Sequence, residues 1–462
     1  MDESTVAEIL HKQRNYFDQG NTRPISFRLK QLKTLKQAVL DNEKKISAAL
    51  WADMRKSEFE AYTTEIECVL CETSGHIRNF ASWTRPEKVP TPLIHFPASS
   101  YIYSEPFGVA LIIAPWNYPF HLSLLPLVGA ISAGNCAILK PSEIAPHTST
   151  AIANMVRGNF DPSFIAVVEG DAKTSQTLLA QKFDYVFFTG GSNIAKIVME
   201  ACARNLTPVT FELGGKSPCI VDKDINVEYT AKRIVWGKFL NAGQTCVAPD
   251  YLLVHQDMKT QLIEWMGKYV EQFYGKDPHS SPDYSRIVNE IHFNRILGLL
   301  KEGNIILGGD SNKDELYIAP TIIDNVSLEH KVMQEEIFGP VLPVMSYDDL
   351  TQAISLVNRL PKPLSLYFFS RDKKNQDRIQ RETTSGGLCI NDTIAQLVTS
   401  YLPFGGVGTS GFGNYHGKYS FNTFSHNKGV LKRSFLFDLK VRYPPYGGRL
   451  RLLKRVLPYA LR

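Results

Sequence analysis

The sequence lacks an apolar run long enough to cross a membrane. A membrane-spanning helix needs about 18 or more consecutive apolar residues, and the longest apolar segment, residues 122–134, is interrupted by Pro126. The first residues, Met1-Asp2-Glu3, are acidic, and no basic and then apolar leader follows them. We therefore expect a cytoplasmic protein.

Cysteine is scarce as well. The 462 residues contain seven cysteines, an odd number without regular spacing, which favours a reducing compartment over a disulfide framework. Cys68 and Cys71 form a CxxC, but apolar residues at helical spacing surround them, which favours two buried helix cysteines over a redox pair. Because no Cys and His groups stand at ligand spacing, no metal site is expected.

Acidic residues are nearly missing from the C-terminal segment. Residues 428–462 hold ten Lys or Arg and one acid, whereas residues 1–427 hold 41 basic and 45 acidic groups. A nucleic-acid-binding protein more often carries a basic stripe across its folded surface, so no nucleic-acid partner is expected.

The basic tail, residues 446–462, has an amphipathic pattern. On a helical wheel one arc holds the apolar residues and the opposite side the basic ones: Leu450, Leu452, Leu453, Val456 and Leu457 against Arg451, Lys454 and Arg455. This pattern is typical of a segment lying on an anionic membrane surface. A terminal helix docked on a partner subunit has the same pattern, and both interpretations remain open.

The length exceeds that of one hydrophobic core, so two or more domains are expected. Residues 1–84 have apolar residues at helical spacing, and proline-rich residues 86–103 suit an extended arm or hairpin. Short apolar strands then alternate with helices, with strands predicted at 109–114, 136–139, 165–168, 185–188 and 208–211, and again at 218–221, 251–254, 341–345, 366–369 and 387–390. This alternation predicts two doubly wound parallel α/β domains whose ligands bind beyond the carboxyl ends of the strands.

Residues 211–249 contain the strongest chemical signal. Glu212 lies on a Gly-Gly turn, and Cys246 on a Gly-containing turn. Glycines let the backbone approach a ligand closely, and a thiol with a nearby base can act as a nucleophile. Taken singly, such a glutamate is more often solvated and such a cysteine more often buried and inert.

Three motifs together resemble aldehyde dehydrogenases: ELGGKSP (212–218), GQTC (243–246) and EEIFGP (335–340). The resemblance covers residues 28–426 and is greatest to class 3 (fatty and aromatic aldehyde) members of bacterial type, whose C-terminal signature is similar to residues 402–411 and 415–418. It implies a Rossmann-like NAD(P)-binding domain (1–85 and 106–213), a catalytic domain (214–400) and a β-hairpin and C-terminal oligomerisation arm (86–105 and 418–445). It also implies a homodimer, with residues 421–425 as a strand pairing across it.

The segment PWNYP (115–119) follows the first predicted strand. By itself, Asn117 is either a cap of the next helix or an amide donor to an oxyanion; the resemblance implies the oxyanion role. Lys140 and Glu143 follow the second strand. Ser142 with Glu143 could be a helix-capping signal, whereas the resemblance implies that Lys140 and Glu143 contact the adenosine ribose. A carboxylate at Glu143 favours NAD over NADP, although class 3 members accept both.

The turn Thr189-Gly190-Gly191 precedes a predicted helix, where backbone N–H groups can face a pyrophosphate. It matches the family turn with two departures, Gly191 in place of Ser and Ala195 in place of Gly. The resemblance assigns cofactor contacts to the following residues: Trp116, Lys140, Glu143, Thr189, Gly190, Gly191, Leu213, Gly214, Glu336 and Phe338.

The chemistry that these residues imply is oxidation of an aldehyde to an acid. Cys246 would form a thiohemiacetal and then a thioester, with Asn117 holding the oxyanion and Glu212 as the general base that activates water. Medium-chain, long-chain or lipid-derived aldehydes are the expected substrates, with peripheral contact at the inner face of the membrane if the tail binds lipid. Two alternatives remain: a semialdehyde dehydrogenase that passes its thioester to coenzyme A, and a catalytically silent binding protein.

Overall fold

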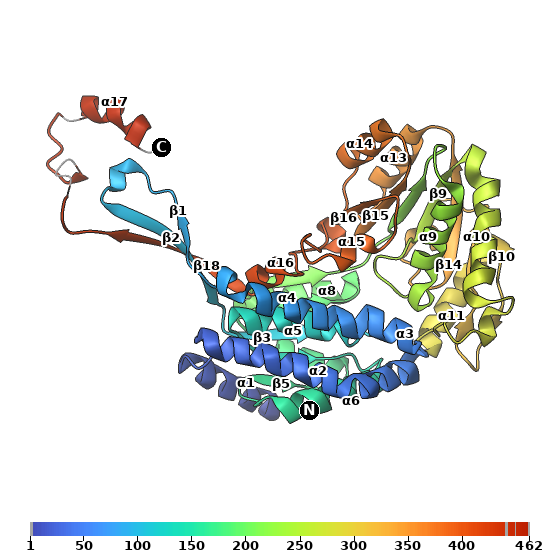
Figure 1. Cartoon of the computed structure of the whole chain (residues 1–462), viewed down its shortest axis with the longest axis horizontal. Coiled ribbons are helices and arrows are strands. Elements are labelled where there is room, and N and C mark those ends of the chain that lie inside the picture. The colour runs from blue at the N-terminus through green and yellow to red at the C-terminus, as the bar shows by residue number, and fades with distance from the viewer. Residues whose placement is uncertain (1–2, 439–441, 449, 461–462) are drawn as a thin grey trace.

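The computed structural model describes residues 3–438, 442–448 and 450–460, apart from the side chains of Leu452, Val456 and Ala460. Two α/β bodies lie side by side, and a thin arm of three strands extends away from the first of them (Figure 1). Each body has its own buried apolar cluster. The α/β architecture predicted from the alternation of strands and helices is therefore confirmed.

Helices form the N-terminal segment, as its periodicity predicts. They are α1 (Glu3–Asp18), α2 (Ile25–Met54), α3 (Glu58–Ala61), a π-helical turn (Tyr62–Ile66) and α4 (Glu67–Trp83). Leu32, Leu35 and Val39 share one face of α2 and are fully buried, because residues three and four apart lie on the same side of a helix. These helices cover the first body.

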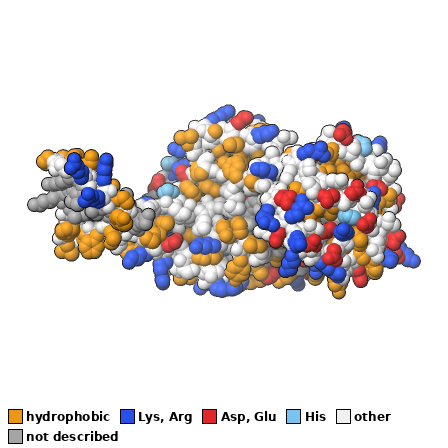
Figure 2. Space-filling view, turned by 90° about the horizontal axis from the view of Figure 1, so that it is seen from above, with side chains coloured by type: hydrophobic (Ala, Val, Ile, Leu, Met, Phe, Trp, Pro, Cys, Tyr) orange, Lys and Arg blue, Asp and Glu red, His pale blue; other side chains and the backbone are white. Residues whose placement is uncertain are grey.

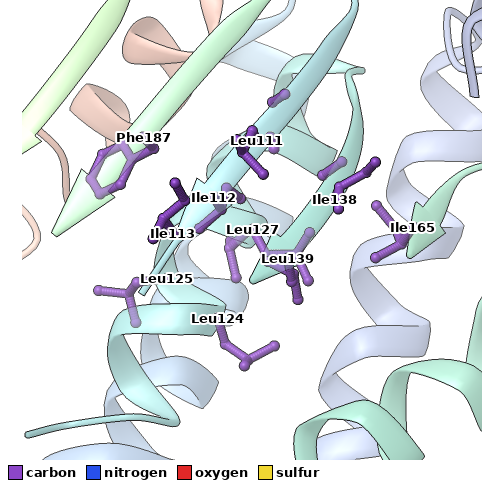
Figure 3. Close-up of a cluster of buried hydrophobic side chains, with 14 of the residues drawn as sticks. Leu111, Ile112, Ile113, Leu124, Leu125, Leu127, Ile138, Leu139, Ile165 and Phe187 are labelled. Carbon is purple, nitrogen blue, oxygen red and sulfur yellow. The ribbon is translucent and has the colours of Figure 1, made fainter. Parts of the chain in front are cut away.

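The first body contains a six-stranded sheet in the order β17-β7-β6-β3-β4-β5. Its strands are β3 (Val109–Ile113), β4 (Cys136–Lys140), β5 (Ile165–Val167), β6 (Tyr185–Thr189), β7 (Val209–Glu212) and β17 (Gly411–Phe412), connected in part by α5 (His121–Ala133), α6 (Pro146–Asn159), α7 (Ala172–Leu179) and α8 (Ser192–Asn205). Ile113 and Leu139 of the strands and Leu124 and Leu127 of α5 belong to its core (Figure 3). Strands buried on both faces read as continuous apolar runs, which is why the sequence pattern locates them.

The second body contains a seven-stranded sheet in the order β10-β13-β14-β9-β8-β15-β16. Its strands are β8 (Pro218–Val221), β9 (Tyr251–His255), β10 (Asn304–Leu307), β13 (Thr321–Asp324), β14 (Val341–Tyr347), β15 (Ser365–Phe369) and β16 (Gly387–Ile390). The accompanying helices are α9 (Val227–Phe239), α10 (Lys259–Tyr274), α11 (Glu290–Leu299), α12 (Lys331–Gln334), α13 (Leu350–Arg359), α14 (Lys373–Glu382) and α15 (Ala395–Val398), and β11 (Ser311–Asn312) pairs with β12 (Tyr317–Ile318). The turn after β7 joins the two bodies.

The sheets are mixed, which differs from the purely parallel prediction. β17 pairs antiparallel with β7, and β10 pairs antiparallel with β13. Both are edge strands, where one antiparallel neighbour is common on an otherwise parallel sheet. β17 is two residues long, too short to leave a periodic signal.

The prediction of a strand at residues 421–425 is wrong. Phe421 lies in α16 (Lys418–Thr423), and Phe421 and Phe424 are both buried. Their spacing of three puts both rings on one side of a helical turn, and the Phe424 ring packs against Gly129 of α5. The strand begins only at Ser425.

The arm consists of β1 (Glu87–Val89), β2 (Ala98–Pro106) and β18 (Ser425–Arg433), all antiparallel. β18 pairs with β2 of the same chain along its whole length. The tail helix α17 (Leu450–Ala460) lies near the end of the arm (Figure 1); the predicted apolar side chains of Leu452 and Val456 lie outside the described residues. Among the helices of the described ranges, none is both long and apolar enough to cross a bilayer.

Candidate active site

Cys246 lies on a turn whose backbone is unusual. Asn241 and Ala242, just before it, have φ of 54° and 50°, in the left-handed region that non-glycine residues seldom occupy. A Cβ added at Gly243 would lie 2.3 Å from the carbonyl oxygen of Gly339. The glycine of GQTC is therefore required because the EEIFGP segment packs directly against its backbone.

Side-chain amides hold this turn in place. Gln244 donates through Nε2 to the carbonyl of Arg286 and accepts at Oε1 from the N–H of Val288, both at 3.0 Å. Inside the cavity, the Tyr118 hydroxyl lies 2.8 Å from the Thr245 hydroxyl. Buried amides with all their partners fix one conformation, so the position of the thiol is set before any ligand binds.

Asn117 is hydrogen-bonded to the turn that carries Cys246 and does not cap the helix that follows it. The side-chain Nδ2 of Asn117 donates to the backbone carbonyl of Gln244 at 3.0 Å. The backbone carbonyl of Asn117 accepts from Nδ2 of Asn241 at 2.9 Å. The N-cap residue of α5 is Phe120. The capping alternative is thus wrong, and a second N–H of the Asn117 amide remains for an oxygen near the thiol.

Glu212 ends β7 and is 2% exposed. Neither of its carboxylate oxygens has a hydrogen-bond partner within the described part of the protein. Burial raises the pKa of this carboxyl well above its ordinary value. A protonated carboxyl cannot accept a proton, so Glu212 can act as a general base only once water or a polar ligand in the site favours its ionised form.

Cys246 and Glu212 line one cavity of about 360 Å³. Most of its wall is apolar, with Leu122 and Leu125 of α5 and Leu397 and Phe404 nearby. Burial raises the pKa of the Cys246 thiol, and the carboxyls of Glu336 and Glu212 raise it further. The thiol is therefore protonated and needs a base to become a nucleophile.

The turn that begins α8 fits an anion. Gly191 is the N-cap of α8, and no side chain among the described residues caps this helix. A Cβ at Gly190 would lie 2.6 Å from the Phe188 ring, whereas one at Gly191 would meet nothing within 4 Å. Uncapped N–H groups at a helix N-terminus are a site for phosphate, so the two departures from the family turn leave this site intact.

Lys140 and Glu143 form an ion pair at the end of β4, with 3.0 Å between Nζ and Oε2. α6 is capped by another element, since the carboxylate of Asp53 in α2 accepts from the N–H groups of His147 and Thr148. The Lys140 ammonium also donates to the carbonyl of Pro141. The Glu143 side chain is 41% exposed at the strand end, where a ribose could contact it, whereas the Lys140 side chain is 2% exposed.

The remaining residues predicted to bind the cofactor contact one another or line the cavity of Cys246. Trp116 contacts the Phe338 ring (centroids 5.3 Å apart) and the ring of His292 (4.8 Å). His292 thus lies against a predicted cofactor residue. Thr189 and Leu213 line the cavity beside Glu212.

Glu336 lies over the backbone of Gly214. A Cβ at Gly214 would lie 2.2 Å from Oε2 of Glu336, so a side chain there would displace the Glu336 carboxyl. Burial is the main reason that the pKa of Glu336 rises to about 8, with a further contribution from the Asp250 carboxylate. The ELGGKSP turn and the EEIFGP loop therefore meet at this carboxyl.

A buried ion pair holds these two motifs together. Lys216 donates to the Asp250 carboxylate and to the carbonyls of Val332 and Glu335, and Asp250 accepts from the N–H of Ile337 at 3.0 Å. Sequence reasoning missed both residues. Their one signal is that each is a charged residue among mainly apolar or small neighbours.

A second buried pair, Lys56 and Glu65, lies behind the Asn117 loop. The ammonium and the carboxylate are 2.5 Å apart, and both side chains are fully buried. Glu65 accepts from the N–H groups of Phe120 and His121 at 2.9 and 3.1 Å, while Lys56 donates to the carbonyl of Asn117 at 3.4 Å. This pair, also missed, clamps both ends of the loop that carries Asn117.

We expect Lys56→Met to lower the free energy of unfolding by about 3–5 kcal/mol, because it leaves the Glu65 carboxylate buried without its counter-ion. Chemical denaturation would measure the change. The control is Lys12→Met, which breaks an exposed pair with Glu8 and should leave the free energy of unfolding nearly unchanged. Similar losses for the two variants would contradict the proposed clamp.

Known proteins resemble this chain over almost its whole length. A sequence model described as "Aldehyde dehydrogenase family" matches residues 1–430. The chain is 47% identical to the 4,4'-diaponeurosporen-aldehyde dehydrogenase of Staphylococcus aureus (97% of this chain, 98% of that protein) and 43% identical to the dimeric NADP-preferring aldehyde dehydrogenase of Canis lupus familiaris (96% and 98%). The solved structure titled "Substrate bound state of Staphylococcus Aureus AldH" superposes with a TM-score of 0.96 at 47% identity, covering 98% of this chain and 99% of that one.

Proposed function

Because the chain belongs to the aldehyde dehydrogenase family, whose members oxidise aldehydes to carboxylic acids with NAD or NADP, we propose that Cys246 is its nucleophile. We further propose Asn117 as the oxyanion donor and Glu212 as the general base. The observation that carries this assignment is that Cys246 and the unpaired Glu212 carboxyl line one cavity, while Asn117 is hydrogen-bonded to the cysteine turn.

In this mechanism, the Cys246 thiol loses its proton to Glu212, directly or through water, and its sulfur attacks the aldehyde carbon. The Asn117 amide and the backbone N–H of Cys246 hold the resulting oxyanion. Bound NAD(P) supplies the acceptor for the hydride that leaves the carbon. Glu212 passes the thiol proton to solvent before the second step. It then takes a proton from the water that attacks the thioester and delivers it to the leaving Cys246 thiolate, so that the acid and the free thiol are released.

The cofactor fits the edge between the two bodies. The uncapped N-terminus of α8, with Thr189, Gly190 and Gly191, would hold its pyrophosphate. Lys140 and Glu143 would hold the adenosine ribose, and a carboxylate there favours NAD, although NADP stays open. The nicotinamide end would lie among Trp116, Leu213, Gly214, Glu336 and Phe338. We propose residues 1–85 and 106–213 as the cofactor domain and residues 214–400 as the catalytic domain.

The proposed substrates are medium-chain and long-chain aldehydes. Leu122, Leu125 and Leu397 line the cavity together with Cys246, and two further lining residues, Trp236 and Val398, are 42% and 73% exposed. Large apolar side chains facing solvent at an entrance favour an apolar ligand.

A series of alkanals from propanal to dodecanal tests this function. With either cofactor, kcat/KM should rise about fourfold for each added methylene, from roughly 0.8 kcal/mol per buried CH₂, until the chain reaches the mouth. The absorbance of the reduced cofactor gives the rate. A flat series would contradict the substrate class, and turnover that requires coenzyme A would favour the acylating alternative.

The arm and the basic tail are the basis for two proposals, one on the oligomeric state of the protein and one on its location in the cell. We propose a homodimer, since one relative is named dimeric, with the arm (residues 86–105 and 418–445) as the oligomerisation element. We also propose a cytoplasmic enzyme whose tail, residues 446–462, contacts the inner face of the membrane. Lys and Arg side chains gather beside apolar ones at the end of the arm (Figure 2), where Leu450 and Phe435 are exposed.

We expect the full-length protein to bind anionic phosphatidylserine vesicles about a hundredfold more tightly than a version ending at Pro445. Arg451, Lys454 and Arg455 would contribute roughly 1 kcal/mol each at such a surface. Cosedimentation measures the affinity, with neutral phosphatidylcholine vesicles as the control. If both versions bind anionic vesicles equally poorly, the tail does not contact membranes.

A further inference from the structure

The Asn117 loop (residues 115–119) and the cysteine turn (residues 241–246) come from different bodies of the molecule. The first follows β3, and the second follows α9. Two hydrogen bonds join them directly: Nδ2 of Asn117 donates to the backbone carbonyl of Gln244, and Nδ2 of Asn241 donates to that of Asn117. An amide can stabilise an oxyanion only at a fixed place, because a displacement of about 1 Å can cost a hundredfold in rate.

The corner that ends α2 reaches both of these segments. Arg55, the residue that caps α2, has φ of 52°, so the chain leaves the helix sharply there. Just before it, the Met54 carbonyl accepts from the backbone N–H of Arg286 at 2.8 Å. Just after it, the Lys56 ammonium donates to the backbone carbonyl of Asn117 at 3.4 Å.

These contacts close a ring of hydrogen bonds. Arg286 holds the cysteine turn, since its carbonyl accepts from Nε2 of Gln244 at 3.0 Å. The ring runs from Lys56 to Asn117, Gln244, Arg286 and Met54, and along the chain back to Lys56. Each member of such a closed network restricts the positions of the others. The corner of α2 therefore fixes the Asn117 loop against the cysteine turn.

The Lys56 ammonium also contacts two neighbours of this ring. It is fully buried, lies 2.5 Å from Oε1 of Glu65 and stands 4.2 Å from the centre of the Tyr118 ring. A cation over an aromatic face is attracted to it. The Tyr118 hydroxyl lies 2.8 Å from that of Thr245, in the cysteine turn. The ammonium thus acts on the Asn117 loop and, through Tyr118, on the cysteine turn.

We propose that Lys56 is a positioning residue for the reaction: it closes this ring and so holds the Asn117 amide where it can stabilise an oxyanion on Cys246. This inference rests on the proposed roles of Asn117 and Cys246. The Lys56 side chain is fully buried, so it acts through Asn117 and not on the substrate. Its loss therefore lowers the rate even in a protein whose fold is not destabilised.

The test compares two variants that both lack the ammonium. Lys56→Met leaves Glu65 without its counter-ion. The double variant Lys56→Met with Glu65→Gln has neither charge of the pair, and the glutamine oxygen can still accept from the N–H groups of Phe120 and His121, as Glu65 does. The melting temperature should fall in the single variant and recover largely in the double variant, because the unpaired buried charge is gone.

The rate should not recover with the fold. In both variants the first turnover, followed by stopped-flow absorbance of the reduced cofactor at saturating aldehyde, should be about ten- to a hundredfold slower than in the wild type. The aldehyde concentration that gives half the maximal rate should stay within about threefold, since substrate binding does not depend on the oxyanion. Recovery of both rate and melting temperature in the double variant would overturn the positioning role.

Two further variants separate the role of Lys56 from a general loss of order. Lys259→Met, in α10, removes an ammonium that lies 2.7 Å from the Asp324 carboxylate and should keep the wild-type rate. If Lys56 acts through Asn117, then adding Lys56→Met to Asn117→Ala should slow the first turnover by no more than about twofold further. A further loss as large as that of Lys56→Met in the wild type would exclude this route.

A reaction without cofactor distinguishes this inference from the proposed oxidation. The ester p-nitrophenyl acetate acylates a thiol through a tetrahedral oxyanion and needs no NAD(P). Absorbance of p-nitrophenolate gives the rate, and mass spectrometry locates the acetyl group on Cys246. If the wild type oxidises no aldehyde but the double variant is acylated about tenfold more slowly, the proposed oxidation fails and the positioning role stands. Equal rates of acylation, or none in the wild type, would overturn the positioning role.

Discussion

Cys246→Ser should lower kcat for aldehyde oxidation by at least about a thousandfold, because loss of a nucleophile commonly removes most of the catalysis that depends on it. A serine hydroxyl ionises far less readily than a thiol, and burial would disfavour its charged form as well. Formation of reduced cofactor, followed by absorbance at saturating aldehyde, measures the loss. Cys202→Ala, in the buried face of α8, is the matched control and should keep its turnover.

Cofactor binding separates loss of chemistry from loss of the fold. Cys246→Ser should bind NAD with an affinity similar to that of the wild type, as measured by quenching of tryptophan fluorescence. A variant that keeps more than about a tenth of the wild-type turnover would exclude Cys246 as the nucleophile, since serine cannot replace a thiol so closely.

Glu212→Gln should lower steady-state kcat by about a hundredfold to ten-thousandfold, the usual contribution of a general base. The amide has the shape of the carboxyl but cannot take a proton. If Glu212 acts mainly on the water that attacks the thioester, the first turnover stays fast and the acyl-enzyme accumulates. A burst of reduced cofactor equal to the enzyme concentration, with the mass of the acyl group on Cys246, would be the result.

The absence of a burst in Glu212→Gln would indicate that Glu212 is needed to deprotonate the thiol before hydride transfer. A kcat within about threefold of the wild type would contradict either role. Glu200→Gln, on the exposed face of α8, is the matched control.

Glu212 should also make stability depend on pH. Burial raises the pKa of Glu212 in the folded protein, so at a pH above its unfolded value of about 4.3 the folded state retains a proton that the unfolded state has lost. Stability from this group is therefore lost as pH rises above that value. The difference in melting temperature between Glu212→Gln and the wild type should therefore grow in favour of the variant as pH rises from about 5 to the raised pKa of Glu212. A difference that does not change with pH would argue against a buried, protonated carboxyl.

Local patterns in the sequence were enough for most of the elements, and the family resemblance was needed to propose the reacting groups. Continuous apolar runs located β3, β4 and β6, and helical spacing located the N-terminal helices, because burial of one face or both faces leaves a period in the chain. The Gly-rich turns around Cys246 and Glu212 indicated close backbone approach, and the approach of Gly339 to Gly243 in the structure has that character.

The tertiary structure alone decided how distant segments meet. Glu65 reaches the N–H groups of α5 about fifty residues later, and Lys216 reaches Asp250 and the EEIFGP loop. Glu72 meets Gly417 across 345 positions. The antiparallel strand β17 and the helix around Phe421 likewise depend on what each segment packs against.

The physical reason is the range of the interactions. Hydrophobic periodicity and backbone preference are properties of neighbouring residues, so they can be read along the chain. A buried charge is stable only through partners that the folded chain brings to it from elsewhere. The sequence by itself therefore determined most of the elements and the family. The packing of those elements decided that the buried pairs Lys56–Glu65 and Lys216–Asp250 hold the loops around Asn117 and Glu336.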